Sequence, residues 1–235
     1  MCLSSPAVPD LVHIRQTTEL AERVLLPGDP GRALRLAQGL LDSPKMLNHN
    51  RGLWGYTGTA ADGELLSIQS TGMGGPSAAI VVTELIELGA RRLLRVGTCG
   101  GLDARLRAGQ LLAVGAALAD DGTSRALGGH ERFARVVGPG GLTDALLSDG
   151  GKQATVVSTD LFYDADDRVA EWIEAGAVAV EMETATIFTV AERYGVEAGC
   201  ALLVSNMAGS SVYLDADALP AAELELGRLA IAALS

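Results

Sequence analysis

The stretch Leu93–Leu102, LLRVGTCGGL, decides how the rest of the chain is interpreted. It begins as an apolar β-strand, in which Arg95 projects from the face opposite to its two apolar neighbours. We expect a strand over residues 91–96 that runs into a glycine turn at Gly97–Gly101. A guanidinium among apolar neighbours needs a carboxylate or a bound anion. Arg95 is therefore either the partner of a structural acid or an anion ligand.

Apolar strands alternate with helical segments on both sides of this stretch, which is typical of an α/β fold. Strands are expected over residues 23–27, 65–69, 111–118, 154–157, 177–180 and 198–204, and helices over 30–41, 77–88, 185–194 and 220–233. The polar, glycine-rich segment 120–141 predicts a mobile loop. The chain contains no internal repeat and no linker, so we expect one domain over residues 1–235.

Composition excludes several classes of protein. The 235 residues are 48% hydrophobic and lack an apolar run of ~20 residues, so neither disorder nor a membrane span is expected. The net charge of −11 disfavours nucleic-acid binding. Cys2, Cys99 and Cys200 form no C-x-x-C pair, and residues 1–10 do not resemble a signal peptide, which indicates a cytoplasmic protein.

Two strand-to-helix junctions are suited to an anion. Gly28 lets the backbone approach a ligand, and Arg32 follows in the first turn of a helix that Asp29 can cap and Pro30 can begin. The alternative is a capped helix with a solvated arginine. At the second junction, Thr98 adds a hydroxyl beside Arg95.

A third junction carries carboxylates. The apolar strand before Glu181 ends directly in Glu181-Met182-Glu183, whose carboxylates could accept hydrogen bonds from a sugar diol. A carboxylate that serves the start of a helix is the alternative.

No cofactor is expected. The glycines of 71–77 lack the third glycine and the later acidic residue of a dinucleotide fingerprint. His13, His49 and His130 have no metal-ligand spacing.

Taken together, these junctions resemble the nucleoside phosphorylase family, which includes bacterial purine nucleoside phosphorylase and uridine phosphorylase. The resemblance implies a three-layer α/β/α fold around a mixed, distorted central sheet, and phosphorolysis of a nucleoside to base and ribose 1-phosphate. The matching stretches, in family order, are LLPGDPGRA (25–33), RGLWGYTG (51–58), STGMGGPSAAI (70–80), LLRVGTCGGL (93–102), STDLFY (158–163), VEMETA (180–185) and LLVSN (202–206).

The resemblance also implies site residues. Those for phosphate are Gly28, Arg32, Arg51, Arg95, Val96, Gly97 and Thr98. Those for the nucleoside are His13, Met73, Phe162, Val180, Glu181, Met182, Glu183, Ser205 and Asn206. Arg32, Arg95 and Asn206 are expected to be catalytic. A neighbouring subunit is expected to lend His13 and Arg51, which makes a dimer the smallest active unit and a hexamer, built as a trimer of dimers, the expected assembly.

The base site departs from the best-known bacterial pattern, which has an aspartate where this chain has Asn206 and an arginine downstream that is absent from residues 207–227. An asparagine cannot act as a general acid, but its amide can donate a hydrogen bond to O6 of a 6-oxopurine. We therefore expect a preference for inosine and guanosine over adenosine. Uridine phosphorylase is the alternative, although the segment 158–168 lacks its glutamine. A nucleosidase of the same fold and a non-catalytic nucleoside-binding protein are further alternatives.

Overall fold

The computed structural model describes residues 11–149, 151–163, 168–208, 210 and 213–235. The strands in these residues are β1 (Arg23–Leu26), β2 (Asp42–Asn48), β3 (Gly55–Thr59), β4 (Leu65–Gln69), β5 (Arg92–Gly101), β6 (Leu111–Asp120), β7 (Arg135–Val136), β8 (Lys152–Thr159), β9 (Ala179–Glu181) and β10 (Glu197–Met207). The helices are α1 (Pro30–Leu40), α2 (Gly75–Glu87), α3 (Gly122–Gly128), α4 (Leu142–Ser148), α5 (Val169–Glu174), α6 (Thr184–Tyr194) and α7 (Leu219–Leu234), with a short 3₁₀ helix, η1, at Asn50–Gly52.

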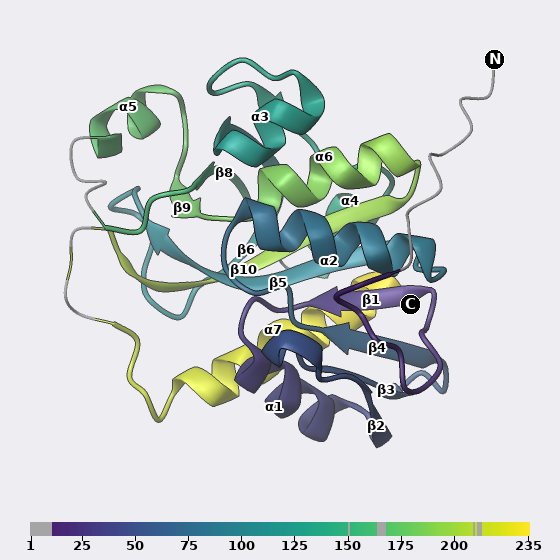
Figure 1. The fold of residues 1–235 in the computed structure, drawn as a ribbon. Coiled ribbons are helices and arrows are strands. Elements are labelled where there is room, and N and C mark those ends of the chain that lie inside the picture. Colours follow the sequence, from purple (N-terminus) through teal and green to yellow (C-terminus); the bar gives the residue numbers. More distant parts are fainter. Residues whose placement is uncertain (1–10, 150, 164–167, 209, 211–212) are drawn as a thin grey trace.

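All these strands belong to one mixed sheet (Figure 1). Their order is β10-β6-β8-β9-β5-β1-β4-β3-β2, and β7 pairs with β6. The long strand β10 pairs with β5 as well as with β6. Strands β5, β9, β8, β6 and β10 therefore close into a ring, and β1, β4, β3 and β2 extend from it as an open sheet. This partial closure is the distortion that the resemblance implied.

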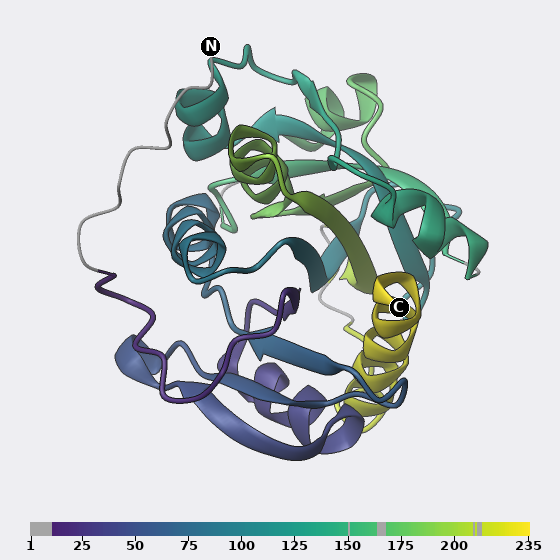
Figure 2. The same cartoon turned by 90° about the vertical axis from the view of Figure 1, so that its right-hand side faces the viewer.

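Helices cover both faces of the sheet (Figures 1 and 2). Helices α1, α4 and α7 pack over one hydrophobic core, to which β5 contributes Leu94 and Val96. Helices α2 and α6 pack over a second core on the opposite face, where Leu93 is buried. The α/β/α layers expected from the sequence are therefore confirmed.

Most expected elements occur within a few residues of their expected bounds, but two expectations were wrong. The glycines Gly97–Gly101 form no turn, because β5 continues through them and pairs with β10 along its length. The segment 120–141 is not a single loop. It contains α3, which Asp121 caps by accepting from the Ser124 N–H at 2.7 Å, and strand β7.

The fold brings the expected junctions together. Strand β1 is parallel to β5, with Leu26 beside Arg95, and it is also parallel to β4. Beyond the strand ends, the N–H groups of Thr71 and Gly72 donate to the carbonyls of Pro27 and Gly28 at 2.9 and 3.0 Å. The chain segments after β1 and β4 therefore lie side by side next to β5.

Candidate active site

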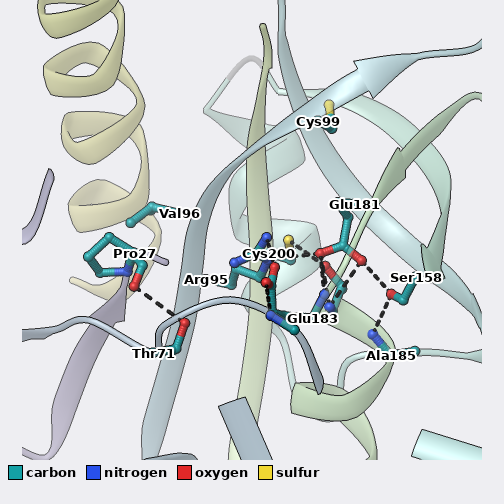
Figure 3. A network of polar contacts seen from close by, with 12 residues as sticks. Pro27, Thr71, Arg95, Val96, Cys99, Ser158, Glu181, Glu183, Ala185 and Cys200 are labelled. Atoms are coloured by element: carbon teal, nitrogen blue, oxygen red, sulfur yellow. Dashed lines mark hydrogen bonds and ion pairs between the residues drawn. The ribbon is translucent and has the colours of Figure 1, made fainter. Parts of the chain in front are cut away.

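Arg95 lies at the centre of the site and is only 3% exposed. Its Nε donates to Oε2 of Glu181 at 3.0 Å, and its Nη2 lies 2.5 Å from Oε2 of Glu183 (Figure 3). Burial disfavours the charged guanidinium, but the two carboxylates hold the pKa of Arg95 above its ordinary value. Nη1 is buried and has no hydrogen-bond partner among the described residues. Arg95 is thus paired with acids, as one of the two expectations held, and its Nη1 keeps a donor without a partner in the described part of the chain.

Gly97 makes room for this guanidinium. A Cβ atom at Gly97 would lie 2.8 Å from Nη2 of Arg95 and 3.0 Å from Cδ2 of Leu202. Any side chain at this position would push the guanidinium away from its carboxylates. The glycine is therefore required by close packing within the strand and not by a turn.

The two glutamates of the third junction have different surroundings. The Glu181 carboxylate accepts from the backbone N–H groups of Glu183 and Thr184, each at 3.0 Å, and from the Ser158 hydroxyl. It is fully committed to Arg95 and to the start of α6 (Figure 3). Glu181 therefore matches the alternative of a carboxylate at a helix start, and its geometry supports a positioning role.

Glu183 faces the chain segment after β4. Its Oε1 accepts from the Gly74 N–H at 2.6 Å, while Oε2 contacts Arg95. Burial raises the pKa of Glu183 and the neighbouring Glu181 adds to the rise, whereas Arg95 and Arg32 oppose it. The net direction is upward. Glu183 is buried, and in its ionised form the carboxylate is a strong hydrogen-bond acceptor that suits a ligand with hydroxyl groups.

Arg32 approaches the same region from α1. The expected cap is present, since Asp29 accepts from the Arg32 N–H at 2.6 Å. The guanidinium is not solvated, because Arg32 is 8% exposed and its Nε donates to Oε1 of Glu223 at 2.7 Å. Its Nη1 lies 3.5 Å from the carbonyl oxygen of Val96 in β5. Arg32 of α1 therefore reaches the backbone of β5, the strand that carries Arg95.

The other expected phosphate residues follow the backbone near these arginines. Gly28 closely faces the chain after β4, because a Cβ atom there would lie 3.3 Å from the carbonyl oxygen of Gly72. Val96 is fully buried and Thr98 is half-buried, opposite Leu203 of β10.

Ser205 and Asn206 lie at the end of β10, where the pairing register with β5 shifts. The Ser205 hydroxyl lies 2.9 Å from Oδ1 of Asn206 and 3.2 Å from the carbonyl of Cys99. Nδ2 of Asn206 donates to the Met207 carbonyl at 3.2 Å. The amide is therefore oriented with its oxygen toward Ser205, and one N–H of Nδ2 has no partner among the described residues.

The remaining nucleoside candidates are more exposed. Met73 is 85% exposed and Phe162 is 64% exposed, and the Phe162 ring packs edge-to-face on Tyr163 with centroids 5.1 Å apart. Val180 and Met182 are half-buried on either side of Glu181. Cys2 and residues 164–167 lie outside the described residues. Residues 164–167 belong to the segment 158–168, in which the resemblance led us to look for the glutamine of a uridine phosphorylase.

His13 and Arg51 are not joined to the other candidates in this single chain. His13 Nδ1 lies 2.7 Å from Oε1 of Glu84, in the last turn of α2. Arg51 is exposed, with φ 58° in the left-handed region. Within the described part of the chain, neither side chain forms an ion pair or hydrogen bond with Arg95 or Glu183.

Three polar groups of the network were missed in the sequence, namely the Gly74 N–H, the Ser158 hydroxyl and the Glu223 carboxylate. A helix start after the glycines hinted at the first. No local pattern marks the other two, because their partners are far away in sequence.

No helix among the described residues is long and apolar enough to span a membrane. The same residues contain no group of three or more metal-ligating side chains.

Comparisons with known proteins agree with this geometry. Residues 22–235 match the family model of the phosphorylase superfamily. The DeoD-type purine nucleoside phosphorylase of Geobacillus kaustophilus is 38% identical over 205 residues, which cover 83% of this chain and 85% of the relative. The guanosine phosphorylase of Halorubrum lacusprofundi is 35% identical over 210 residues, covering 85% of each chain.

Among solved structures, a uridine phosphorylase from Vibrio fischeri superposes with a TM-score of 0.80 at 26% identity, covering 92% of this chain and 91% of that one. The match to the family model covers nearly the whole chain, and the relatives cover most of its length at more than 30% identity. The chain therefore belongs to the phosphorylase superfamily.

Proposed function

We propose that this protein is a purine nucleoside phosphorylase, which uses inorganic phosphate to convert purine ribonucleosides or deoxyribonucleosides to the free base and the pentose 1-phosphate. One observation carries the proposal. Arg95 is buried and paired with Glu183, and its Nη1 has no partner in the part of the chain that the structure describes, so a donor suited to an anion lies directly beside a carboxylate acceptor. Relatives named DeoD-type purine nucleoside phosphorylase and guanosine phosphorylase support the purine class.

In the proposed reaction, a phosphate oxygen forms a bond to C1′ of the pentose while the bond from C1′ to the base nitrogen breaks. The electron pair of that bond leaves with the base, which takes a proton from solvent. Arg32 and Arg95 hold the phosphate, and Gly28, Gly97 and Thr98 line the proposed phosphate site. The bound phosphate stabilises the positive charge that develops on the sugar. Glu183 accepts hydrogen bonds from the pentose hydroxyl groups, and no metal or organic cofactor takes part.

We propose a preference for 6-oxopurines. The Asn206 amide is oriented by Ser205, so that an N–H of Nδ2 is available to O6 of inosine or guanosine. O6 also delocalises the charge of the leaving base. Adenine has an amino group in place of O6, so it offers no acceptor to the Asn206 N–H and no oxygen to delocalise the charge. An asparagine also cannot protonate N7 of adenine.

A complete site is proposed to need a second subunit. The exposed Arg51 and the half-buried His13 have no contact with Arg95 in one chain, which fits residues lent to a neighbour's site. A dimer would then be the smallest active unit and a hexamer the full assembly.

The free, buried Cys99 and Cys200 are consistent with a reducing cytoplasm.

The test is base release from inosine, guanosine, adenosine and uridine, each with and without phosphate. Phosphate-dependent release from inosine and guanosine, with adenosine slow, is the expected result. Release mainly from uridine would instead assign the activity of the structural neighbour. Release without phosphate would indicate a nucleosidase, and binding without release a non-catalytic protein.

A further inference from the structure

Glu223, on the first turns of the C-terminal helix α7, joins two arginines of α1. Its Oε1 accepts from Nε of Arg32 at 2.7 Å. Its Oε2 accepts from Nε and Nη2 of Arg35 at 2.9 and 2.7 Å. Glu223 is 1% exposed, so this carboxylate is buried between the two helices. Nothing in the sequence near Glu223 marks it as part of a site.

The arrangement controls one edge of the Arg32 guanidinium. A guanidinium is planar, and holding its Nε edge determines where its Nη groups point. Glu223 occupies the Nε edge, and Nη1 then lies 3.5 Å from the Val96 carbonyl, one residue from Arg95. Glu223 therefore leaves Nη1 of Arg32 directed toward β5, where its one hydrogen bond among the described residues is the long contact with the Val96 carbonyl.

Arg35 anchors the carboxylate independently of Arg32. It supplies two of the three arginine hydrogen bonds to Glu223, and its side chain is 41% exposed. A buried carboxylate with a second cationic partner does not have to leave when Arg32 binds a ligand. Glu223 can therefore keep its contact with Arg32 throughout a catalytic cycle.

We propose that Glu223 is a positioning residue of the phosphate site, which makes α7 part of that site although it contacts no substrate. The proposal rests on the proposed function, because it takes inorganic phosphate as the ligand of Arg32. It excludes the opposite arrangement, in which Glu223 competes with phosphate for Arg32 and is displaced by it. The two arrangements predict opposite effects of removing the charge of Glu223.

Glu223→Gln is the first test. In a glutamine an NH2 donor replaces one of the two carboxylate oxygens, and it would face the N–H groups of either Arg32 or Arg35, which have no acceptor left there. We expect KM for phosphate to rise about tenfold, while KM for inosine changes less than twofold. The increase in melting temperature that inorganic phosphate produces is expected to shift to higher phosphate concentration. The matched control is Glu225→Gln on the same helix, whose carboxylate is exposed and whose one ion-pair partner among the described residues is Arg228 at 3.3 Å.

Arg35→Met is the second variant, which keeps the test decisive if Glu223→Gln does not fold. It leaves Arg32 intact and removes a half-exposed side chain. We expect a smaller rise in KM for phosphate, with KM for inosine unchanged. If the wild type is active and both variants have the wild-type KM for phosphate, the inference is overturned while the proposed function stands. A KM for phosphate below the wild-type value in Glu223→Gln would have the same meaning. A wild-type protein without phosphate-dependent cleavage would overturn the proposed function, and the inference with it.

Discussion

Nη2 of Arg95 lies 2.5 Å from Oε2 of Glu183, so one buried ion pair joins the group proposed to bind phosphate to the group proposed to bind the pentose. Each residue of the pair makes a further hydrogen bond: Arg95 donates to Glu181, and Glu183 accepts from the Gly74 N–H. Neither side chain can move without disturbing the other. Substitutions at this pair are therefore expected to affect both substrates.

Glu183→Gln is expected to lower kcat/KM for inosine by about 10². The glutamine can still accept from Gly74, but it loses the ion pair with Arg95 and the charged acceptor for the sugar hydroxyls. Steady-state kinetics measures the loss, and circular dichroism checks that the fold is kept. Wild-type kinetics in a folded variant would exclude Glu183 from the reaction.

The acid limb of the pH profile is expected to report on Glu183. Its pKa is raised by burial, so on acidification the carboxylate takes up a proton at a higher pH than an ordinary glutamate would. Protonation removes the acceptor, and kcat/KM should fall as the pH falls through this raised pKa. A profile of kcat/KM for inosine at saturating phosphate tests the sign. The titration of phosphate is common to wild type and Glu183→Gln, so only the part of the limb that the variant loses belongs to Glu183.

Gly97→Ala is expected to raise KM for phosphate about tenfold and to lower the melting temperature, because the new methyl group would overlap the Arg95 guanidinium. Gly100→Ala on the same strand is the matched control. A Cβ atom at Gly100 has its nearest neighbour, Cγ1 of Val180, at 3.3 Å. Equal effects of the two alanines would show that the loss comes from general strain in β5.

Asn206→Asp is expected to raise the ratio of adenosine to inosine activity by about tenfold or more, because an aspartic acid can protonate N7 of the leaving adenine. Base release from both nucleosides under identical phosphate concentrations measures the ratio. An unchanged ratio would remove Asn206 as the determinant of base preference.

Mixed dimers test whether sites are shared between subunits. Arg51→Ala and Glu183→Gln homo-oligomers are each expected to be nearly inactive. A dimer with one subunit of each kind would contain one site with both native residues, so co-expression with two affinity tags should restore activity. If the purified mixed dimer is as inactive as its parents, Arg51 acts within its own chain, and an active Arg51→Ala homo-oligomer would exclude Arg51 from the site.

The local elements could be predicted from the sequence because short-range preferences determine them. Asp29 and Pro30 begin α1 as expected, and β4 has its expected bounds. Glycine was the misleading signal, since Gly97–Gly101 are typical of a turn but lie in a long strand. These glycines are small enough for the Arg95 guanidinium and the side chains of β10 to pack against them. No local sequence pattern reveals such packing.

The sequence by itself determined the fold class, the family and the segments that supply Arg32, Arg95 and Glu183, because alternating apolar runs and ordered junction motifs are local information. Only the tertiary structure decided how these groups share their charges. It joined Glu181 to Arg95 and to the start of α6, and it joined Glu183 to Arg95 and to the Gly74 N–H, although the two glutamates are separated by one residue. It also brought Glu223 to Arg32 across 191 positions. Such pairings depend on how the helical layers and the closed part of the sheet pack, and buried charges find their partners only after that packing is complete.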